Sequence, residues 1–454
     1  MTSAAAASRE LVEHLRALIR LRTVNPPGDE ILAARYLADV LAAAGLEPRL
    51  LEPFPGRGNV VARLRGDGSG GGPLLLLGHL DVVPADAARW TRDPFGGEIA
   101  DGYVYGRGAV DMKAMVAMEL QVVLGLAADV RAAGGRPDRD PVPGLRRDVI
   151  FAATADEEAG GYQGAGWIVD HEPELLRADA CLTEAGGVSV ELAGRRFYAI
   201  GVAEKGFHRF EITVHGGGGH ASMPRDDNAV VLAGRVLERL GRPTPARVTP
   251  LMAATVRAVA AALPGDPRAL VERLLAGETA AVCDAPTGRA LRALLRDTIS
   301  PTIVHAGVKD NVIPGTATIV VDCRTLPGTT EAAMEAELEA QIGAELWAHC
   351  TLRTPFPPGP PLEQPLPHPL YDLCAATIER HDPGCMAVPV MAPFATDAKH
   401  TTRLGIPTYG FSPLRLAPDE PFLERFHGDD ERVGLDALRF GLPVLDEVVR
   451  TWCG

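Results

Sequence analysis

The chain has 454 residues, of which 46% are hydrophobic and 23% are charged. This length exceeds one ordinary hydrophobic core, so we expect two domains without extensive disorder. The formal net charge of -14 argues against a nucleic-acid partner, because phosphate binding needs clustered Lys and Arg. No apolar run is long enough to cross a membrane, and the cysteines form no Cys-x-x-Cys pair. We therefore expect a cytoplasmic protein without a membrane partner.

The first part of the chain alternates helices and strands. Apolar residues recur at helical spacing from Glu10 to Leu21 and from about Glu30 to Ala44. Further along, short apolar runs predict buried strands, with helical stretches between or after them. The predicted strands are Leu74–Leu77, Val149–Ala153 and Ala180–Leu182, and the predicted helices are Met112–Ala127 and Ala165–Asp170. This alternation predicts an α/β fold with a mostly parallel sheet and helices on both faces.

The middle of the chain predicts a smaller α+β domain. Phe207–Val214 and Ala317–Arg324 alternate as antiparallel strands do, whereas Ala229–Leu240 and Thr330–Ile342 have the period of helices. The Ala-rich segment from about Arg242 to Ser300 is expected to be helical, without an assigned role.

These patterns predict the division of the chain into domains. Residues 1–204 and 358–454 are expected to form the α/β domain, and residues 205–357 an inserted lid or dimerisation domain. A Pro-dense stretch from residue 356 to 367 cannot be helical and is expected to be a stiff connector.

Residues that can bind a metal follow the predicted strands. His79 and Asp81 follow the first strand, Glu157 and Glu158 the second, and Glu184 the third. Ligands of open α/β sheets bind beyond the carboxyl ends of the strands, so these side chains should converge. Singly, each has a simpler explanation, such as a core histidine or solvated charge at a strand end. Together, His, Asp and paired Glu at one sheet edge favour a zinc site.

Asp111 is a further candidate ligand for the predicted metal site. It ends the motif Gly106-Arg-Gly-Ala-Val-Asp, at the start of a predicted helix. Alone, this residue could simply cap the helix. Several carboxylates cannot gather at one place as anions unless cations accompany them, so Asp111 is expected to join the metal site.

Four motifs make a family resemblance specific. They are Gly78-His-Leu-Asp-Val-Val-Pro, Gly106-Arg-Gly-Ala-Val-Asp-Met-Lys, Asp156-Glu-Glu-Ala-Gly-Gly and Gly219-His-Ala-Ser-Met-Pro. The chain resembles, from about Leu11 to Val448, the co-catalytic zinc metallopeptidases that include glutamate carboxypeptidase, aminoacylase and succinyl-diaminopimelate desuccinylase. The stretches Phe411-Ser-Pro-Leu and Phe426-His-Gly-Asp-Asp-Glu are most similar to the carboxypeptidase S branch.

The resemblance implies a site with two zinc ions, for which cobalt could substitute. One zinc would be held by His79, Asp111 and Glu184, and the other by Asp111, Glu158 and His427, so that Asp111 bridges them. Glu157 would be the general base that accepts a proton from a water shared by the metals. Asp81 would orient His79.

The resemblance also implies residues that contact the substrate. His220 matches a histidine that stabilises the oxyanion, often from the partner subunit of a homodimer. Asn311 and Arg324 match positions that bind the substrate carboxylate. Thr396 and Asp397 match a substrate loop that usually begins with two glycines, which Phe394 and Ala395 replace here.

The expected activity is hydrolysis of the amide bond of a small peptide or N-acyl amino acid with a free carboxylate. His215-Gly-Gly-Gly resembles the oxyanion loop of lipases, but the chain has no Gly-x-Ser-x-Gly nucleophile motif. The alternative from another class is a binding protein that has lost catalysis, and hydrolysis of any N-acyl amino acid would separate the two.

Lysine is rare in this chain, and each lysine lies beside one of these motifs. The lysines are Lys113, Lys205, Lys309 and Lys399. A compact ammonium can fit where a planar guanidinium does not. Coincidence is the simpler explanation for any one of them.

Overall fold

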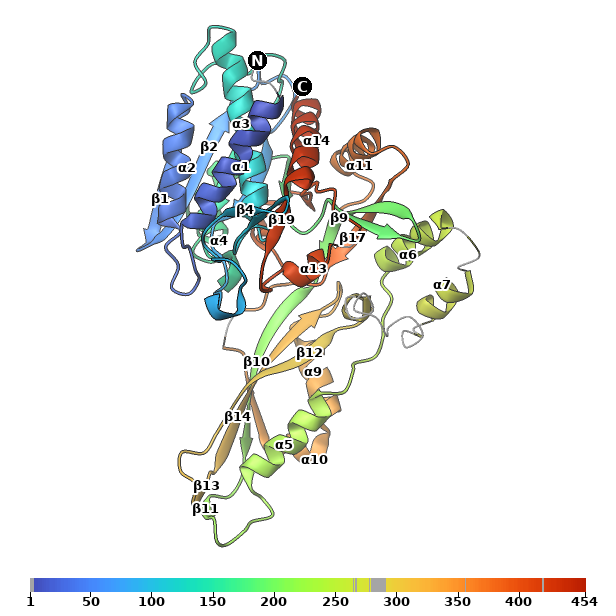
Figure 1. Ribbon diagram of the computed structural model, residues 1–454. Coiled ribbons are helices and arrows are strands. Elements are labelled where there is room, and N and C mark those ends of the chain that lie inside the picture. The colour runs from blue at the N-terminus through green and yellow to red at the C-terminus, as the bar shows by residue number, and fades with distance from the viewer. Residues whose placement is uncertain are drawn as a thin grey trace. The chain divides into compact units, whose positions relative to one another are not determined.

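The computed structural model describes residues 4–263, 265, 268–276, 278, 291–355, 357–418 and 420–454. The chain divides into two compact units (Figure 1). The first unit contains Met1–Val202, Gln364–Val390 and Thr396–Gly454. The second unit contains Ala203–Glu363 and Met391–Ala395.

The first unit is built on one large sheet with the strand order β1-β2-β6-β3-β7-β18-β9, and β8 and β17 also pair with β9. The four central strands, β6, β3, β7 and β18, run parallel, while β1, β2 and β9 pair antiparallel at the flanks. The strands are β1 (Arg49–Phe54), β2 (Arg57–Leu64), β3 (Leu74–His79), β6 (Val149–Thr154), β7 (Ala180–Thr183), β8 (Val188–Leu192), β9 (Arg195–Glu204), β17 (Met386–Ala392) and β18 (Thr408–Gly410). The central strands are completely buried, which explains their continuous apolar sequences.

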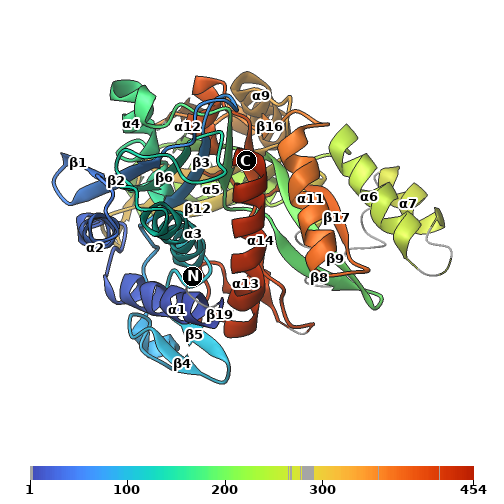
Figure 2. The same ribbon diagram turned by 90° about the horizontal axis from the view of Figure 1, so that it is seen from above.

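Helices cover both faces of this sheet (Figure 2). Leu75 and Ile150 point toward Ile168 of α4 on one face, and α3 packs on β3 and β6 from the other. In Figure 2, α4 and α12 lie on one side of the sheet, and α1, α2, α3 and α14 on the other. The helices of the unit are α1 (Ala4–Arg20), α2 (Ile31–Ala43), α3 (Lys113–Ala132), α4 (Ala165–His171), α11 (Pro369–His381), α12 (Ala398–Thr401), α13 (Phe422–Arg425) and α14 (Leu435–Cys453), with 3-10 turns η1 (Ala87–Arg89), η2 (Glu157–Ala159), η3 (Pro173–Leu175) and η5 (Thr402–Leu404).

A small antiparallel sheet joins distant parts of the first unit. It consists of β4 (Glu98–Ala100), β5 (Tyr103–Tyr105) and β19 (Arg432–Gly434). Residue 105 pairs with residue 432, so the segment that follows β5 lies beside the segment that precedes β19. The first of these segments ends at Asp111, and the second contains His427.

The second unit is an antiparallel sheet with the order β12-β14-β10-β15 and helices packed on it. In β14, buried and more exposed residues alternate, and the buried ones pack with α5 and α9 in one core. The elements are β10 (Gly206–His215), β11 (Gly219–His220), β12 (Thr298–Ala306), β13 (Val312–Ile313), β14 (Thr316–Thr325), β15 (Cys350–Arg353), β16 (Leu362–Glu363), α5 (Ala229–Leu240), α6 (Pro250–Ala262), α7 (Arg268–Leu275), α9 (Glu331–Ile342) and α10 (Ala344–Trp347).

One predicted segment differs from the structure. Helices α6 and α7 lie within the expected helical stretch from Arg242 to Ser300, but Thr298–Ser300 already belong to strand β12. The cause is pairing with β14, where Ile299 opposes Cys323 and packs, partly buried, against the core of the second unit. Residues 279–290 of the predicted segment lie outside the described residues, as does Phe356 of the predicted connector.

Within the described ranges, no helix has both the length and the apolar composition of a membrane span.

His400 fixes the loop that follows β6. Its buried ring lies on α12, and Nε2 is 2.9 Å from the carbonyl oxygen of Gly160. The ring of Tyr162 meets it edge to face at 5.4 Å. Donation to a carbonyl needs only the neutral imidazole, and burial lowers the pKa of His400 to about 4.

We therefore predict that His400 makes the first unit sensitive to acid. Because the folded state binds fewer protons than the unfolded state between pH 6.5 and 4, stability falls as pH falls through this window and levels off below it. The loss between pH 7 and pH 5 should be about 2 kcal/mol. Chemical denaturation of the wild type and of His400→Gln, which can still donate to Gly160, tests this. From pH 7 to pH 5, the free energy of unfolding of the wild type should fall by about 2 kcal/mol more than that of the variant. Equal pH dependence would contradict the prediction.

Candidate functional site

The carboxyl ends of three parallel strands bring chemically active side chains together. His79 is the last residue of β3, Glu157 and Glu158 begin η2 just beyond β6, and Glu184 follows β7. Since β6, β3 and β7 are parallel neighbours, all four residues lie at one edge of the sheet. This is the edge where open α/β sheets bind ligands.

Asp111 lies between two histidines. Its Oδ1 is 3.0 Å from Nε2 of His79, and its Oδ2 is 3.3 Å from Nε2 of His427. Nε2 of His79 is also 3.8 Å from Glu184 Oε2, and Nε2 of His427 is 3.1 Å from Glu158 Oε2. One carboxylate thus offers one oxygen to each half of the cluster.

Two groups in this cluster have the geometry of metal sites. The ligand atoms of His79, Glu157 and Glu184 lie within 4.8 Å of one another, and so do those of Asp111, Glu158 and His427. The His79 side chain is 1% exposed and the His427 side chain 53% exposed, so the cluster opens to solvent on the side of the second group.

Asp81 fixes the backbone that carries the two glutamates. Its Oδ1 accepts a hydrogen bond from the Glu157 amide and its Oδ2 one from the Glu158 amide, each at 3.1 Å. Its carbonyl oxygen lies 3.0 Å from Nδ1 of His79. Burial disfavours the Asp81 carboxylate, but His79 and these donors outweigh burial and lower its pKa. Asp81 therefore connects the histidine of one group with the glutamates of both.

Glu431 was missed as a functional residue, although it closes the motif that begins at Phe426. Its Oε1 accepts hydrogen bonds from the amides of Val110 at 2.7 Å and Asp111 at 3.1 Å. Its Oε2 pairs with Arg107 at 2.7 Å. This fully buried carboxylate holds the Asp111 loop against the His427 segment.

A second network of buried side chains supports the site, and no sequence motif pointed to Arg57 or Asn25. Arg57 contacts Glu30 at 3.1 Å and Asp156 through Nη2 and Oδ1. Asn25 donates to Asp81 Oδ2 at 2.8 Å and accepts from Arg57 at 3.2 Å. The side chains of Asn25, Glu30 and Arg57 thus fix the turn that presents the glutamates.

Protons and a bound metal would compete for the same carboxylate and imidazole atoms in this cluster. Burial raises the pKa of Glu158 to about 7 and that of Glu184 well above its usual range. Hydrogen bonds to Asp111 and Glu158 raise the pKa of His427 to about 10. Without a cation, the cluster therefore retains protons that a bound metal would displace.

The cluster suits a divalent metal. Oε1 of Glu158 is buried and has no hydrogen-bond partner among the residues that the structure describes. An unsatisfied carboxylate oxygen is costly when buried, unless a cation completes its coordination. Imidazole nitrogen and carboxylate oxygen are the donors that catalytic zinc sites use. The residues present therefore fit zinc.

The residues predicted to contact substrate are not among the side chains of the two ligand groups. Thr396 and Asp397 are buried in the first unit, where Asp397 Oδ2 accepts a hydrogen bond from Thr154 Oγ1 at 3.0 Å. The other three belong to the second unit: His220, Asn311 and Arg324.

Within the second unit, two of these three residues are neighbours. His220 of β11 is exposed and lies 2.7 Å from Ser222 through Nδ1. The backbone carbonyl of Asn311 accepts a hydrogen bond from the amide of Ala221 at 3.1 Å. Arg324 is half-buried, and its guanidinium pairs with Asp322 at 2.8 Å.

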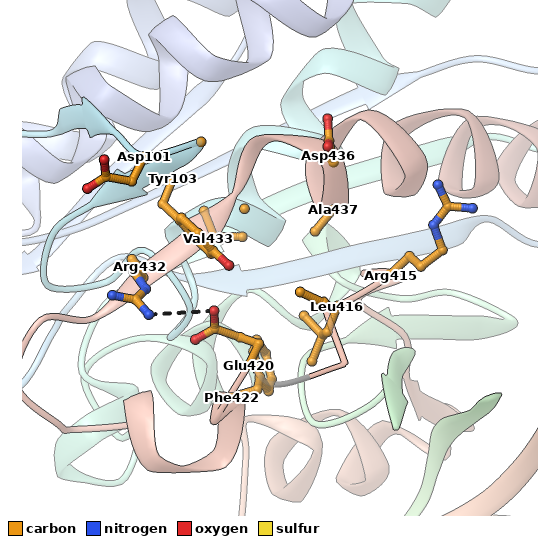
Figure 3. A pocket seen from close by; sticks show the side chains of 13 residues that line it. Asp101, Tyr103, Arg415, Leu416, Glu420, Phe422, Arg432, Val433, Asp436 and Ala437 are labelled. Carbon is orange, nitrogen blue, oxygen red and sulfur yellow. Dashed lines mark ion pairs between the residues drawn. The ribbon is translucent and has the colours of Figure 1, made fainter. Parts of the chain in front are cut away.

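A cavity of about 260 Å³ lies in the first unit, around the start of α14 (Figure 3). Glu420 and Arg432 face each other there, with Oε2 and Nη2 3.7 Å apart. The Arg432 guanidinium lies 4.8 Å from the centre of the Tyr103 ring. None of the predicted site residues lines this cavity, so the candidate site is the open cluster described above.

The chain is similar to known proteins over most of its length. Residues 75–451 match the peptidase family M20/M25/M40. A probable carboxypeptidase S-like 2 of Dictyostelium discoideum is 30% identical over 373 residues, which cover 80% of this chain and 68% of that protein. The N-fatty-acyl-amino acid synthase/hydrolase PM20D1 of Xenopus tropicalis is 27% identical over 95% of this chain and 83% of that protein.

A solved structure shares the fold over nearly the whole chain. The M20 family metallo-carboxypeptidase Sso-CP2 from Sulfolobus solfataricus superposes with a TM-score of 0.72 and 17% identity, covering 98% of this chain and 99% of that one. The family match spans most of the sequence, including every side chain of the histidine and carboxylate cluster. The chain belongs to the peptidase family M20/M25/M40 and is a metallopeptidase or amidohydrolase.

Proposed function

We propose that this protein uses two zinc ions to hydrolyse the amide bond of a small peptide or N-acyl amino acid that carries a free carboxylate. The observation that carries the proposal is Asp111, whose two oxygens face His79 and His427 at 3.0 and 3.3 Å. A carboxylate with one histidine on each side is the arrangement that two bridged metals need. The names of the relatives, a carboxypeptidase and an N-acyl amino acid hydrolase, support this substrate class.

Each metal has three proposed protein ligands. His79, Asp111 and Glu184 would hold the first zinc, and Asp111, Glu158 and His427 the second. Zinc bound there would polarise the scissile carbonyl and activate a water for attack. Cobalt should replace zinc, because the same nitrogen and oxygen donors suit both ions.

Glu157 is the proposed general base. Its side chain is 11% exposed and its carboxylate lies within 4.8 Å of ligand atoms of His79 and Glu184, so it could accept a proton from a water held there. A base must be close to the water yet free to take its proton. Asp81 would orient His79 and hold both glutamates by their amides, as its contacts support.

Five further residues are proposed to act in substrate recognition. Arg324 and Asn311 would bind the substrate carboxylate, for which a guanidinium fork is well suited. His220 would stabilise the oxyanion that forms at the attacked carbonyl. Thr396 and Asp397 would shape the substrate-binding region from within the protein, because both side chains are buried.

The alternative is a homologue that binds metal and ligand without catalysis. Glu157 speaks against it, because a binding protein has no need for a carboxylate beside the ligands. We also propose a cytoplasmic location, and homodimerisation through the second unit. The dimer is supported by apolar side chains exposed along α5 and the neighbouring outer strand β12. These side chains are Val230, Val231, Ile303 and Val304.

The glutamate pair gives the sharpest test of this mechanism. Glu157→Gln removes the base but no ligand, so zinc should stay and turnover should fall by about 10²–10⁴-fold. Glu158→Gln should lose part of its zinc, since a neutral amide is a poor ligand. The assay is a panel of dipeptides and N-acyl amino acids with zinc or cobalt, together with elemental analysis of each variant.

Excess zinc should partly restore Glu158→Gln and leave Glu157→Gln unchanged. The reverse pattern would mean that the two roles are exchanged. If the wild type hydrolyses no compound of the panel although it binds metal, the non-catalytic alternative is favoured.

Metal content should follow the proposed ligand sets. Protein reloaded with excess zinc should hold up to two ions per chain, and His427→Ala should weaken mainly one site. Asp111→Ala should weaken both, because both ligand sets contain it. Elemental analysis and chelator competition measure this. A wild type without bound metal would refute the proposed function.

The dimer predicts a specific loss of association. Val304→Glu places a charge on an exposed position of β12, so sedimentation should change from dimer to monomer. Val190→Glu is the matched control, because Val190 is similarly exposed but lies on β8 of the first unit. If His220 acts on the partner's substrate, mixed His220→Ala and Glu157→Gln subunits should recover activity. No recovery after demonstrated subunit exchange would place His220 with its own chain's site.

A further inference from the structure

Glu157 is held by an ammonium. Its Oε1 lies 3.3 Å from Nζ of Lys399. Asp111, Glu158 and Glu184 pair only with histidines in the described part of the chain. Among these four acidic residues, the proposed base is therefore the one with a lysine as its described partner.

Lys399 cannot easily turn away from Glu157. Its side chain is 4% exposed, and Nζ donates to the carbonyl oxygen of Thr396 at 2.9 Å. Oδ1 of Asp397 lies 3.8 Å from the same nitrogen. Asp397 is bonded in turn to Thr154, the last residue of β6, so the ammonium is tied to the strand that presents the glutamates.

The geometry leaves Glu157 with two conflicting options. Its carboxylate is within ligand distance of His79 and Glu184, as a metal ligand would be. A base must instead stay off the metal, so that its oxygen can accept a proton. The distance between Glu157 and the other ligand atoms fits both roles. The residue that pairs with the Glu157 carboxylate distinguishes them.

We propose that Lys399 is a positioning residue that holds Glu157 by Oε1 and so prevents it from becoming a metal ligand. This inference rests on the proposed two-metal function. A buried carboxylate seeks a positive partner, and Lys399 supplies one in place of the metal. Without the ammonium, Glu157 would turn to the nearest remaining cation, the first metal.

The test compares the coordination of cobalt in protein variants. Cobalt absorption reports the number and kind of ligands, independently of turnover. In Lys399→Met, the spectrum should change as Glu157 joins the first metal, and chelator competition should show tighter metal binding. Turnover should fall by about 10–100-fold while KM changes little, the usual effect of losing a residue that orients a functional group.

Two further variants assign the effect to Glu157. In Lys399→Met/Glu157→Gln, the spectrum and metal affinity should return to those of Glu157→Gln alone, because no carboxylate is left to bind. Lys399→Arg keeps the positive charge and should keep the wild-type spectrum. Lys205→Met is the matched control, since Lys205 is also buried and donates to the carbonyls of Ala293 and Arg296, but in the second unit. Its cobalt spectrum should be that of the wild type.

An unchanged cobalt spectrum and metal affinity in folded Lys399→Met would overturn the inference, even if activity falls. If that variant does not fold, Lys399→Gln answers the same question with a polar side chain. Failure of the proposed function is a separate result, because the wild type would then bind no metal or hydrolyse no substrate.

Discussion

Mutual repulsion among carboxylates is the constraint on which the site depends. Asp111, Glu157, Glu158 and Glu184 meet at the edge of a buried sheet, and their side chains are 8 to 12% exposed. Water cannot screen charges that are so deeply placed, and the raised pKa values of Glu158 and Glu184 reflect this. The fold must therefore supply positive charge there, and histidines, a lysine and the proposed metals are its sources.

Rigid support opposes this repulsion. Asp81 holds the glutamate turn by two amides, and Glu431 holds the Asp111 loop by two others. In both cases a buried carboxylate is bound to backbone rather than to metal. The acidic residues near the site thus divide into those that face the cation and those that hold the chain in place. Their residue type alone does not distinguish these tasks, but their hydrogen-bond partners do.

The sequence was informative where an apolar pattern identifies a buried strand and candidate ligand residues follow that strand in the chain. Leu74–Leu77 and Val149–Ala153 are apolar throughout because both faces of their strands are covered, and this placed His79 and the glutamates at one edge. Glu431, Arg57 and Asn25 could not be found in this way, because their partners are 27 to 324 residues distant in the chain. Lys399 was noticeable as a rare lysine, but its contact with Glu157 spans 242 residues.

The position of β18 has a consequence for the order in which the protein can assemble. Among the described strands of the large sheet, Thr408–Gly410 comes last in chain order, yet it lies in the interior of the sheet between β7 and β9. During translation, one side of β7 stays unpaired by β18 while more than two hundred residues are synthesised, including Ala203–Glu363 of the second unit. The nascent chain therefore carries an incomplete sheet until residues 408–410 are available to pair with β7. His427 follows later still in the chain, so the cluster can be complete only after residue 427 has been synthesised.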